Sequence, residues 1–165
     1  MSYKPRLYNL KNIACVKILA YYNKIMAINL ENLEKAINSL DEITQRTLDD
    51  LFMSRQDLIT RNGLKAGVIK NFEFTYELCW KHIQRWLEIN IGSTYIDGIT
   101  RRELFRLAQE KHIIDDSNKW FNYHDARNIS SHTYNVTSSD LIFNSINNFV
   151  QDAKNLLNTL KNKND

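Results

Sequence analysis

Arg127 and His132 lie close together in the stretch ARNISSHTYN, residues 126–135, separated by four residues. The guanidinium of Arg127 is permanently charged and can bind two phosphate oxygens through parallel N–H donors. The imidazole of His132 titrates near neutral pH, so it can accept or donate a proton. The pair could cleave RNA without a metal: His132 would take the proton of a ribose 2′-hydroxyl, and Arg127 would stabilise the charge growing on the phosphate. A simpler interpretation is a polar helix end at the surface.

Neighbouring polar residues could support this chemistry. Asn128 and Asp125 could orient the pair, or could be ordinary solvated residues. Ser131 could hydrogen-bond back to a helix carbonyl and bend the chain. The phenol of Tyr134 adds a polar group two residues beyond the histidine, where an amphipathic plug at a helix end is the alternative.

The geometry of a regular helix limits how the pair can meet. Residues five positions apart point about 140° away from each other around the helix axis. Arg127 and His132 therefore converge best if the helix loosens near Ser131, or if a second chain supplies the partner groups.

Amphipathic segments must position these residues, and their periodicity predicts helices. Thr100, with Glu103 three residues later, forms a capping box that starts one of them. Gly92 follows the second helix, where a left-handed stop is easy. The expected helices cover about residues 30–52, 65–89, a short segment after residue 100, 118–131, and a segment that starts between 137 and 140 and continues to 160.

The scarcity of turn residues favours an all-α fold. Four glycines and one proline in 165 residues are too few for the tight turns of a many-stranded β-protein. We predict an up-and-down bundle of four or five helices, with the segment after residue 100 a shorter insertion. Bundles of this shape often pair about a two-fold axis, so a homodimer is expected.

No metal or cofactor is expected. Glu73 and Glu77 lie one turn apart with Lys81 four residues on, which is typical of a surface ladder, and there is no second carboxylate pair. The sequence has no glycine-rich phosphate loop and no zinc signature. Three histidines lack ligand spacing and are interpreted as structural or exposed: His82, His112 and His124.

Cysteine spacing and hydropathy indicate a cytoplasmic protein that does not contact a membrane. Cys15 and Cys79 are isolated, which suits a reducing cytosol. No segment approaches the length of a membrane span. The apolar stretch near the N-terminus is split by Lys17 and lacks a cleavage site for a signal peptide.

Residues 1–25 differ from the rest of the chain. They hold five basic residues and no acidic ones, so the remaining 140 residues carry a net charge of −2 against a total of +3. Either residues 1–25 are a genuine basic extension, or the start codon lies upstream of the natural one and Met26 is the true beginning. Residues 26–165 form the predicted helical domain.

At the level of whole segments, the chain resembles the HEPN-domain proteins that are paired with a minimal nucleotidyltransferase, also called nucleotidyltransferase substrate-binding proteins. The likeness covers about residues 30–160, which favours Met26 as the natural start. The segments that carry it are GVIKNFEFTYELCWKHIQRWLE (67–88), RRELFRLAQEKHIID (101–115) and WFNYHDARNISSHTYN (120–135).

The resemblance implies an all-α homodimer and a ribonuclease motif made by Arg127 and His132, with Asn128 at the polar position after the arginine. In one branch of the family the motif extends to a tyrosine, which Tyr134 matches. In that branch the HEPN protein is a toxin that cleaves RNA. The nucleotidyltransferase is its antitoxin and uses ATP to attach adenylate to the tyrosine.

Two other interpretations stay open. The chain could be a non-catalytic subunit that holds a nucleotide or substrate for its transferase partner, because an arginine in a cleft binds phosphate whether or not cleavage follows. It could also be a purely structural helical dimer, for which replacement of Arg127 would have no effect on binding or activity.

Overall fold

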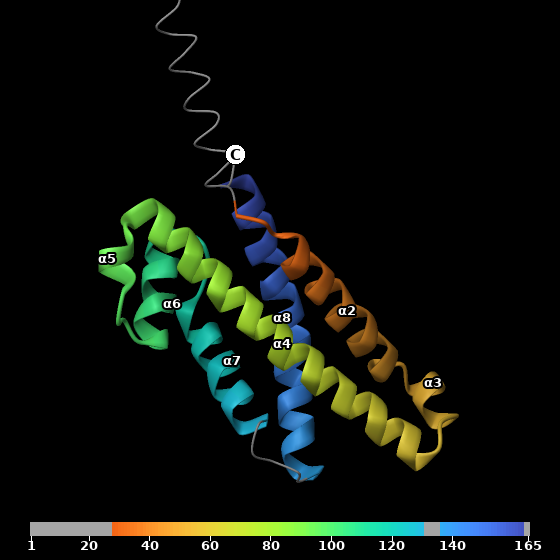
Figure 1. Ribbon diagram of the computed structural model, residues 1–165. Coiled ribbons are helices and arrows are strands. Elements are labelled where there is room, and N and C mark those ends of the chain that lie inside the picture. Colours follow the sequence, from red (N-terminus) through yellow and green to blue (C-terminus); the bar gives the residue numbers. More distant parts are fainter. Residues whose placement is uncertain (1–27, 131–135, 164–165) are drawn as a thin grey trace, which may run out of the picture.

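The computed structural model describes residues 28–130 and 136–163, and in these ranges the chain is helical without any strand. Figure 1 shows the long helices packed along one another, with shorter helices at one side and at one end. The helices are α2 (Glu31–Leu48), α3 (Asp50–Ser54), α4 (Leu58–Ile91), α5 (Ser93–Ile96), α6 (Arg101–Glu110), α7 (Ser117–Ser130) and α8 (Val136–Asn162). The predicted all-α bundle is confirmed.

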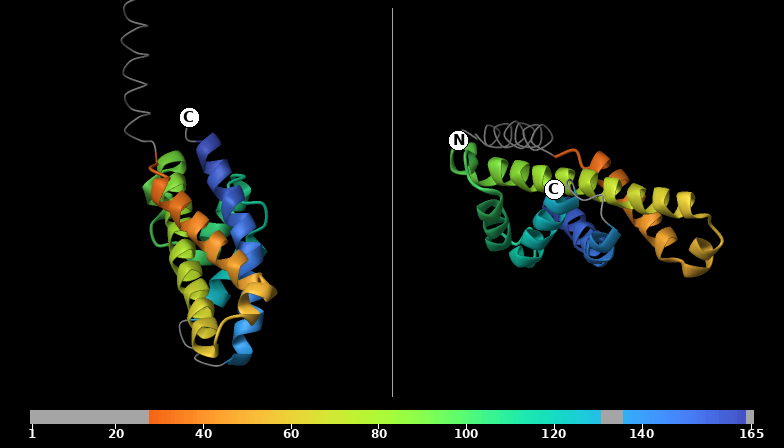
Figure 2. Two further views of the ribbon diagram at one scale, coloured as in Figure 1. Left: turned by 90° about the vertical axis from the view of Figure 1, so that its right-hand side faces the viewer. Right: turned by 90° about the horizontal axis from the view of Figure 1, so that it is seen from below.

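Helix α4 is the centre of the bundle. It packs against α2 and α8 and also against the α6–α7 unit, as the views in Figures 1 and 2 show. The apolar spacing in this segment predicts an inner face of seven residues, of which five are buried and two, Ile69 and Trp80, are partly buried. The five buried residues are Phe72, Tyr76, Cys79, Ile83 and Leu87. The short α6 is the predicted insertion between the long helices.

An aromatic cluster joins α4, α6, α7 and α8. The ring of Phe149 meets Phe72 edge-on at 5.0 Å between centroids and lies 5.9 Å from Trp120. Phe105 of α6 packs on Trp120 at 5.5 Å. Tilted and edge-to-face contacts of this kind add to the free energy gained by burying the rings. They fix the position of α7, which carries Asp125, Arg127 and Asn128, against α4.

Polar contacts at the other side of α7 support this position. Tyr123 donates a hydrogen bond of 2.7 Å from its hydroxyl to Asp152 of α8, and Lys119 forms an ion pair of 3.2 Å with the same carboxylate. Helix α7 is therefore held on two faces, by α8 and by α4.

The predicted helix 30–52 is interrupted, which corrects the prediction. Asp49 has an extended backbone (ψ 97°), and its carboxylate accepts a hydrogen bond of 2.9 Å from the amide of Phe52. A side chain that caps a new helix ends the previous one. Leu48 and Leu51 continue the apolar spacing of this segment in the sequence, which predicts them on the inner face, but they are 47% and 65% exposed.

Helix α4 begins earlier than predicted, at Leu58 instead of about residue 65. Asp57 caps it by accepting a hydrogen bond of 2.9 Å from the amide of Thr60. The first turns are exposed to solvent, with Leu58 and Ile59 at 64% and 85%. An exposed segment has no buried face, so it lacks the periodicity from which helices are predicted.

The two predicted helix-end signals are confirmed. Thr100 and Glu103 form the reciprocal capping box at the start of α6. Gly92 follows α4 with φ 110°, a backbone conformation that residues with a Cβ rarely adopt. The segment 92–99, expected to be a loop, contains the single turn α5.

The interpretations of the N-terminal segment and the homodimer stay predictions. The basic segment 1–25 and the proposed start at Met26 lie outside the described residues, and a homodimer stays a prediction. None of the helices in the described ranges is both long enough and apolar enough to cross a membrane.

Candidate functional site

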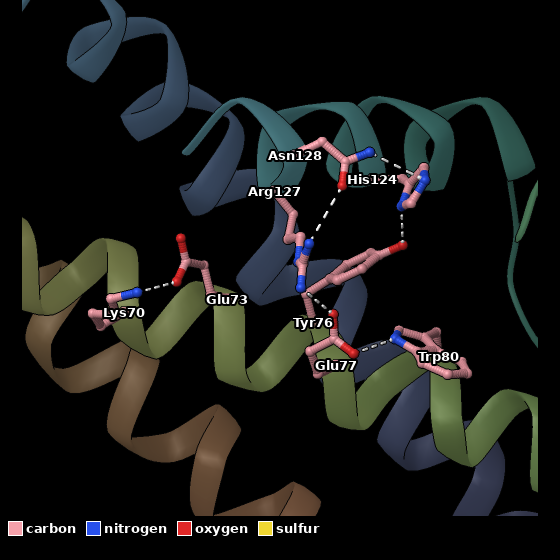
Figure 3. A network of polar contacts seen from close by, with 8 residues as sticks. All are labelled: Lys70, Glu73, Tyr76, Glu77, Trp80, His124, Arg127 and Asn128. Carbon is pink, nitrogen blue, oxygen red and sulfur yellow. Dashed lines mark hydrogen bonds and ion pairs between the residues drawn. The ribbon is translucent and has the colours of Figure 1, made fainter. Parts of the chain in front are cut away.

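The candidate site lies where the last turns of α7 cross the middle of α4 (Figure 3). Arg127 points from α7 toward α4, and its Nη2 forms an ion pair of 2.9 Å with Oε1 of Glu77. The two side chains are 35% and 32% exposed, so the pair is partly shielded from water. Partial shielding strengthens an ion pair relative to one on the open surface.

Glu77 has a different role from the one predicted. Its second oxygen, Oε2, accepts a hydrogen bond of 2.9 Å from the indole nitrogen of Trp80. The carboxylate therefore bridges Trp80 and Arg127, and it does not form the expected surface ladder with Lys81. Glu73 makes the local ion pair instead, at 2.7 Å from the ammonium of Lys70. The partner of the Glu77 carboxylate is therefore Arg127 on another helix, and the spacing of residues within α4 does not reveal it.

A row of polar contacts leads from Arg127 through Asn128 and His124 to the buried Tyr76. The Arg127 Nη1 lies 3.5 Å from the amide oxygen of Asn128, and the amide nitrogen lies 3.3 Å from Nε2 of His124. The other ring nitrogen, Nδ1, lies 2.9 Å from the hydroxyl of Tyr76. The predicted supporting role of Asn128 beside Arg127 agrees with this geometry.

The hydrogen-bond donors and acceptors in this network determine the tautomer of His124. Arginine has only donors, so the Asn128 amide must present its oxygen to Arg127 and its NH₂ group to His124. Nε2 of His124 is then an acceptor, and the neutral ring carries its proton on Nδ1 and donates it to the oxygen of Tyr76. Protonation of Nε2 would place two donors face to face, so this arrangement requires a neutral imidazole.

The electrostatics of the site agree with a neutral His124. Burial, and next the positive charge of Arg101, lower the pKa of His124 below its ordinary value of 6.5. Burial also raises the pKa of Tyr76 above its ordinary value of 10, so its hydroxyl stays protonated. His124 was expected to be structural or exposed; it is half-buried and hydrogen-bonded within the cluster.

Asp125 contacts a different arginine. Its carboxylate lies 3.2 Å from Nη2 of Arg102 on α6, and both side chains are about half exposed. An exposed pair of this kind contributes little to stability. Of the two alternatives for Asp125, orientation of the site or a solvated position, the structure favours a solvated residue that links α7 to α6.

Arg101 also belongs to the site, although no motif in the sequence indicates it. Its guanidinium carbon lies 3.1 Å from the centroid of the Trp80 ring, so the planar group stacks on the indole. Trp80 lies in the aromatic-rich stretch FEFTYELCWK (72–81), which is typical of core packing, but it is half-buried. Residues 80 and 101 have no periodic relation, so only the packing of α6 on α4 brings them together.

Three of the predicted site residues, His132, Ser131 and Tyr134, lie outside the described residues. They follow α7 directly in the chain, after the turn that carries Arg127 and Asn128. The convergence of Arg127 and His132 thus stays a prediction. In the described ranges no three His, Cys, Asp or Glu side chains are grouped so as to bind a metal ion.

Comparison with known proteins gives matches over most of the chain. Residues 28–162 match the family model described as nucleotidyltransferase substrate binding protein like. A Haemophilus influenzae protein named probable ribonuclease HepT is 33% identical over 138 residues, which are 83% of this chain and 94% of that protein.

Solved structures agree with these matches. A Haemophilus influenzae structure, described as revealing the fold of a substrate binding domain of a nucleotidyltransferase, matches with a TM-score of 0.78 and 33% identity. The match covers 81% of this chain and 99% of that one. A Thermus thermophilus protein has the same fold, with a TM-score of 0.62 and 24% identity over 78% of this chain and 98% of its own.

Proposed function

This chain belongs to the family of nucleotidyltransferase substrate binding proteins, and from this premise we propose that it is a HEPN toxin that cleaves RNA without a metal. A minimal nucleotidyltransferase antitoxin would inhibit it by adenylylation of Tyr134, as in type VII toxin–antitoxin pairs. The relative named as a ribonuclease supports this proposal. The observation that carries it is the orientation of Arg127 by Glu77 and Asn128, five residues before His132 in the sequence.

In the proposed reaction His132 is the general base. It removes the proton of a ribose 2′-hydroxyl, and the 2′-oxygen attacks the adjacent phosphorus. The bond from phosphorus to the 5′-oxygen breaks, and that oxygen takes a proton from an imidazolium or from water. The products are a 2′,3′-cyclic phosphate and a 5′-hydroxyl end, and no metal or redox partner is required.

Arg127 would stabilise the transition state. Negative charge builds up on the non-bridging phosphate oxygens during the attack, and a guanidinium can bind two of them at once. Glu77 and Asn128 restrict where this guanidinium can lie, so less conformational freedom is lost when the substrate arrives. In a homodimer two copies of the site would line a shared cleft.

Tyr134 would be the off switch. Its phenol oxygen attacks the α-phosphorus of ATP on the partner transferase, pyrophosphate leaves, and an adenylate ester remains on the tyrosine. The added phosphate is negatively charged and two residues from His132, so it would compete with the RNA phosphate for Arg127. ATP is used by the partner, and the chain itself needs no cofactor.

Cleavage of RNA in the presence of EDTA tests the proposal. The wild-type protein should cut, and Arg127→Ala and His132→Ala should each lower the rate at least about a hundredfold, as removal of a catalytic group does. His112→Asn is the matched control, because it removes another imidazole outside the site. Cutting by His132→Ala at the rate of this control would refute the assignment.

The switch is tested by adding the partner transferase and ATP. Mass analysis should find one adenylate on the Tyr134 peptide, together with loss of RNA cleavage. Tyr134→Phe should stay unmodified and active, whereas Tyr95→Phe, which alters a tyrosine 73% exposed, should still be modified and inhibited. Inhibition without modification of Tyr134 would contradict this part of the proposal.

A second candidate function is a non-catalytic subunit that holds a nucleotide or substrate for its transferase. The family description and the solved relative's description as a substrate binding domain favour it. It predicts tight association with the transferase and no RNA cleavage by the free protein. The digestion in EDTA separates the two functions.

A further inference from the structure

Arg101 has the features of an anion-binding side chain, and no acidic side chain among the described residues forms an ion pair with it. Its guanidinium lies flat on Trp80, 3.1 Å from the ring centroid, and is half-buried. Across the described residues, this guanidinium forms no hydrogen bond and no ion pair. The next residue, Arg102, differs because its guanidinium forms an ion pair with Asp125.

A continuous set of contacts joins Arg101 to Arg127. Arg127 binds one oxygen of Glu77, the indole of Trp80 binds the other oxygen, and Arg101 stacks on that indole. Arg127 and Arg101 therefore both lie near the carboxylate of Glu77. Burial is the main cause that lowers the pKa of Arg101; Tyr76 and Glu77 raise this pKa, and the positive charge of Arg127 lowers it.

We propose that Arg101 is a second phosphate-binding arginine, which holds a phosphodiester of an RNA strand next to the one at Arg127. The proposal deepens the proposed function and rests on it for the identity of the ligand. Trp80 fixes the plane of the guanidinium, so its N–H donors are oriented before the anion arrives. A planar fork whose donors form no hydrogen bond within the described ranges can match two oxygens of one phosphate.

Salt dependence of RNA binding tests this inference. The probe is a fluorescein-labelled, mixed-sequence RNA in which every ribose carries a 2′-O-methyl group, so that it lacks the attacking hydroxyl. For single strands the slope of log K against log salt concentration changes by about 0.7 for each phosphate contact. Arg101→Gln should reduce the slope by about 0.7 and weaken binding at least tenfold, which is typical of losing a charge-assisted hydrogen bond.

Two further variants separate a binding role from a structural or general charge effect. Arg101→Lys keeps the charge but lacks the fork, so it should keep the slope and bind with intermediate affinity. Arg61→Gln removes an exposed arginine on α4, about 28 Å along the helix from Trp80, and should keep the wild-type slope. Circular dichroism and melting temperature confirm that each variant is folded.

The outcomes are distinct. Equal slopes for Arg101→Gln and Arg61→Gln overturn the inference, as does wild-type protein that shows no salt-dependent RNA binding. Loss of ATP binding by Arg101→Gln with unchanged RNA binding also overturns it, and assigns the residue to a free nucleotide. A reduced slope in a protein that does not cut ordinary RNA supports the Arg101 site and refutes the ribonuclease function.

Discussion

Glu77 is predicted to have opposite effects on RNA affinity and on the rate of cleavage. Its carboxylate holds Arg127 at 2.9 Å and also carries a negative charge into a phosphate-binding cluster. Glu77→Gln keeps the size of the side chain and an acceptor for Trp80, but removes the charge. RNA should therefore bind more tightly while cleavage becomes slower.

The size of the affinity effect follows from the geometry. Two oxyanions that hydrogen-bond to opposite sides of one guanidinium lie about 6 Å apart or more. At about 6 Å their repulsion is about 0.7 kcal/mol in water and about 1.4 kcal/mol at half that dielectric constant, which suits a site one-third exposed. Loss of this repulsion should tighten RNA binding by about three- to tenfold.

The rate effect has the opposite sign because Arg127 loses the partner that positions it. A catalytic group that is free to move by about 1 Å can lose about a hundredfold in rate, so single-turnover cleavage should slow by about ten- to a hundredfold. Both quantities are measured in the same buffer, with 2′-O-methyl RNA for binding and ordinary RNA for cleavage.

Glu88→Gln is the matched control for this prediction. Glu88 lies three turns further along α4 and pairs with Arg85 at 3.5 Å, far from the cluster. If Glu77→Gln changes affinity and rate no more than Glu88→Gln does, the Glu77–Arg127 pair has no part in binding or catalysis. A parallel loss of both affinity and rate would indicate that the carboxylate only supports the fold.

Three other predictions concern stability. His124→Gln should make the unfolding free energy depend less on pH below about 6.5. The half-buried imidazole has a lowered pKa, so as the pH falls the unfolded wild-type chain is protonated before the folded one and stability is lost. Denaturant titrations at several pH values measure this difference. Gly63→Ala should raise the unfolding free energy by about 0.5–1 kcal/mol, since the added methyl meets no atom within 4 Å in an α-helix. Gly92→Ala should lower it by about 1–2 kcal/mol, because φ is 110° there; thermal melts test both glycines.

The fold was largely predictable because its helices bury regular apolar faces. Phe72, Tyr76, Cys79, Ile83 and Leu87 in α4 and the line from Ile146 to Leu160 in α8 are buried as their apolar spacing indicates. Prediction failed where a helix has no buried face, as at the exposed start of α4. It also failed at Asp49, whose capping role outweighs the periodicity that continues through it.

The candidate site was predictable only in part, because its contacts cross between helices. Arg127 and Asn128 were found from a local motif, and the structure brings them together. The partner of Arg127 is Glu77, fifty positions away, where local spacing suggested a pair with Lys81. Arg101 has no local signal at all, since stacking on Trp80 depends on how α6 packs against α4.

The most direct test of the central claim is the chemical nature of the RNA ends made in EDTA. If His132 activates the 2′-hydroxyl beside Arg127, mass spectrometry should find 2′,3′-cyclic phosphate and 5′-hydroxyl ends, and the rates for Arg127→Ala and His132→Ala should fall together. Ends that carry a 5′-phosphate, or cyclic phosphate produced at the wild-type rate by His132→Ala, would contradict the account.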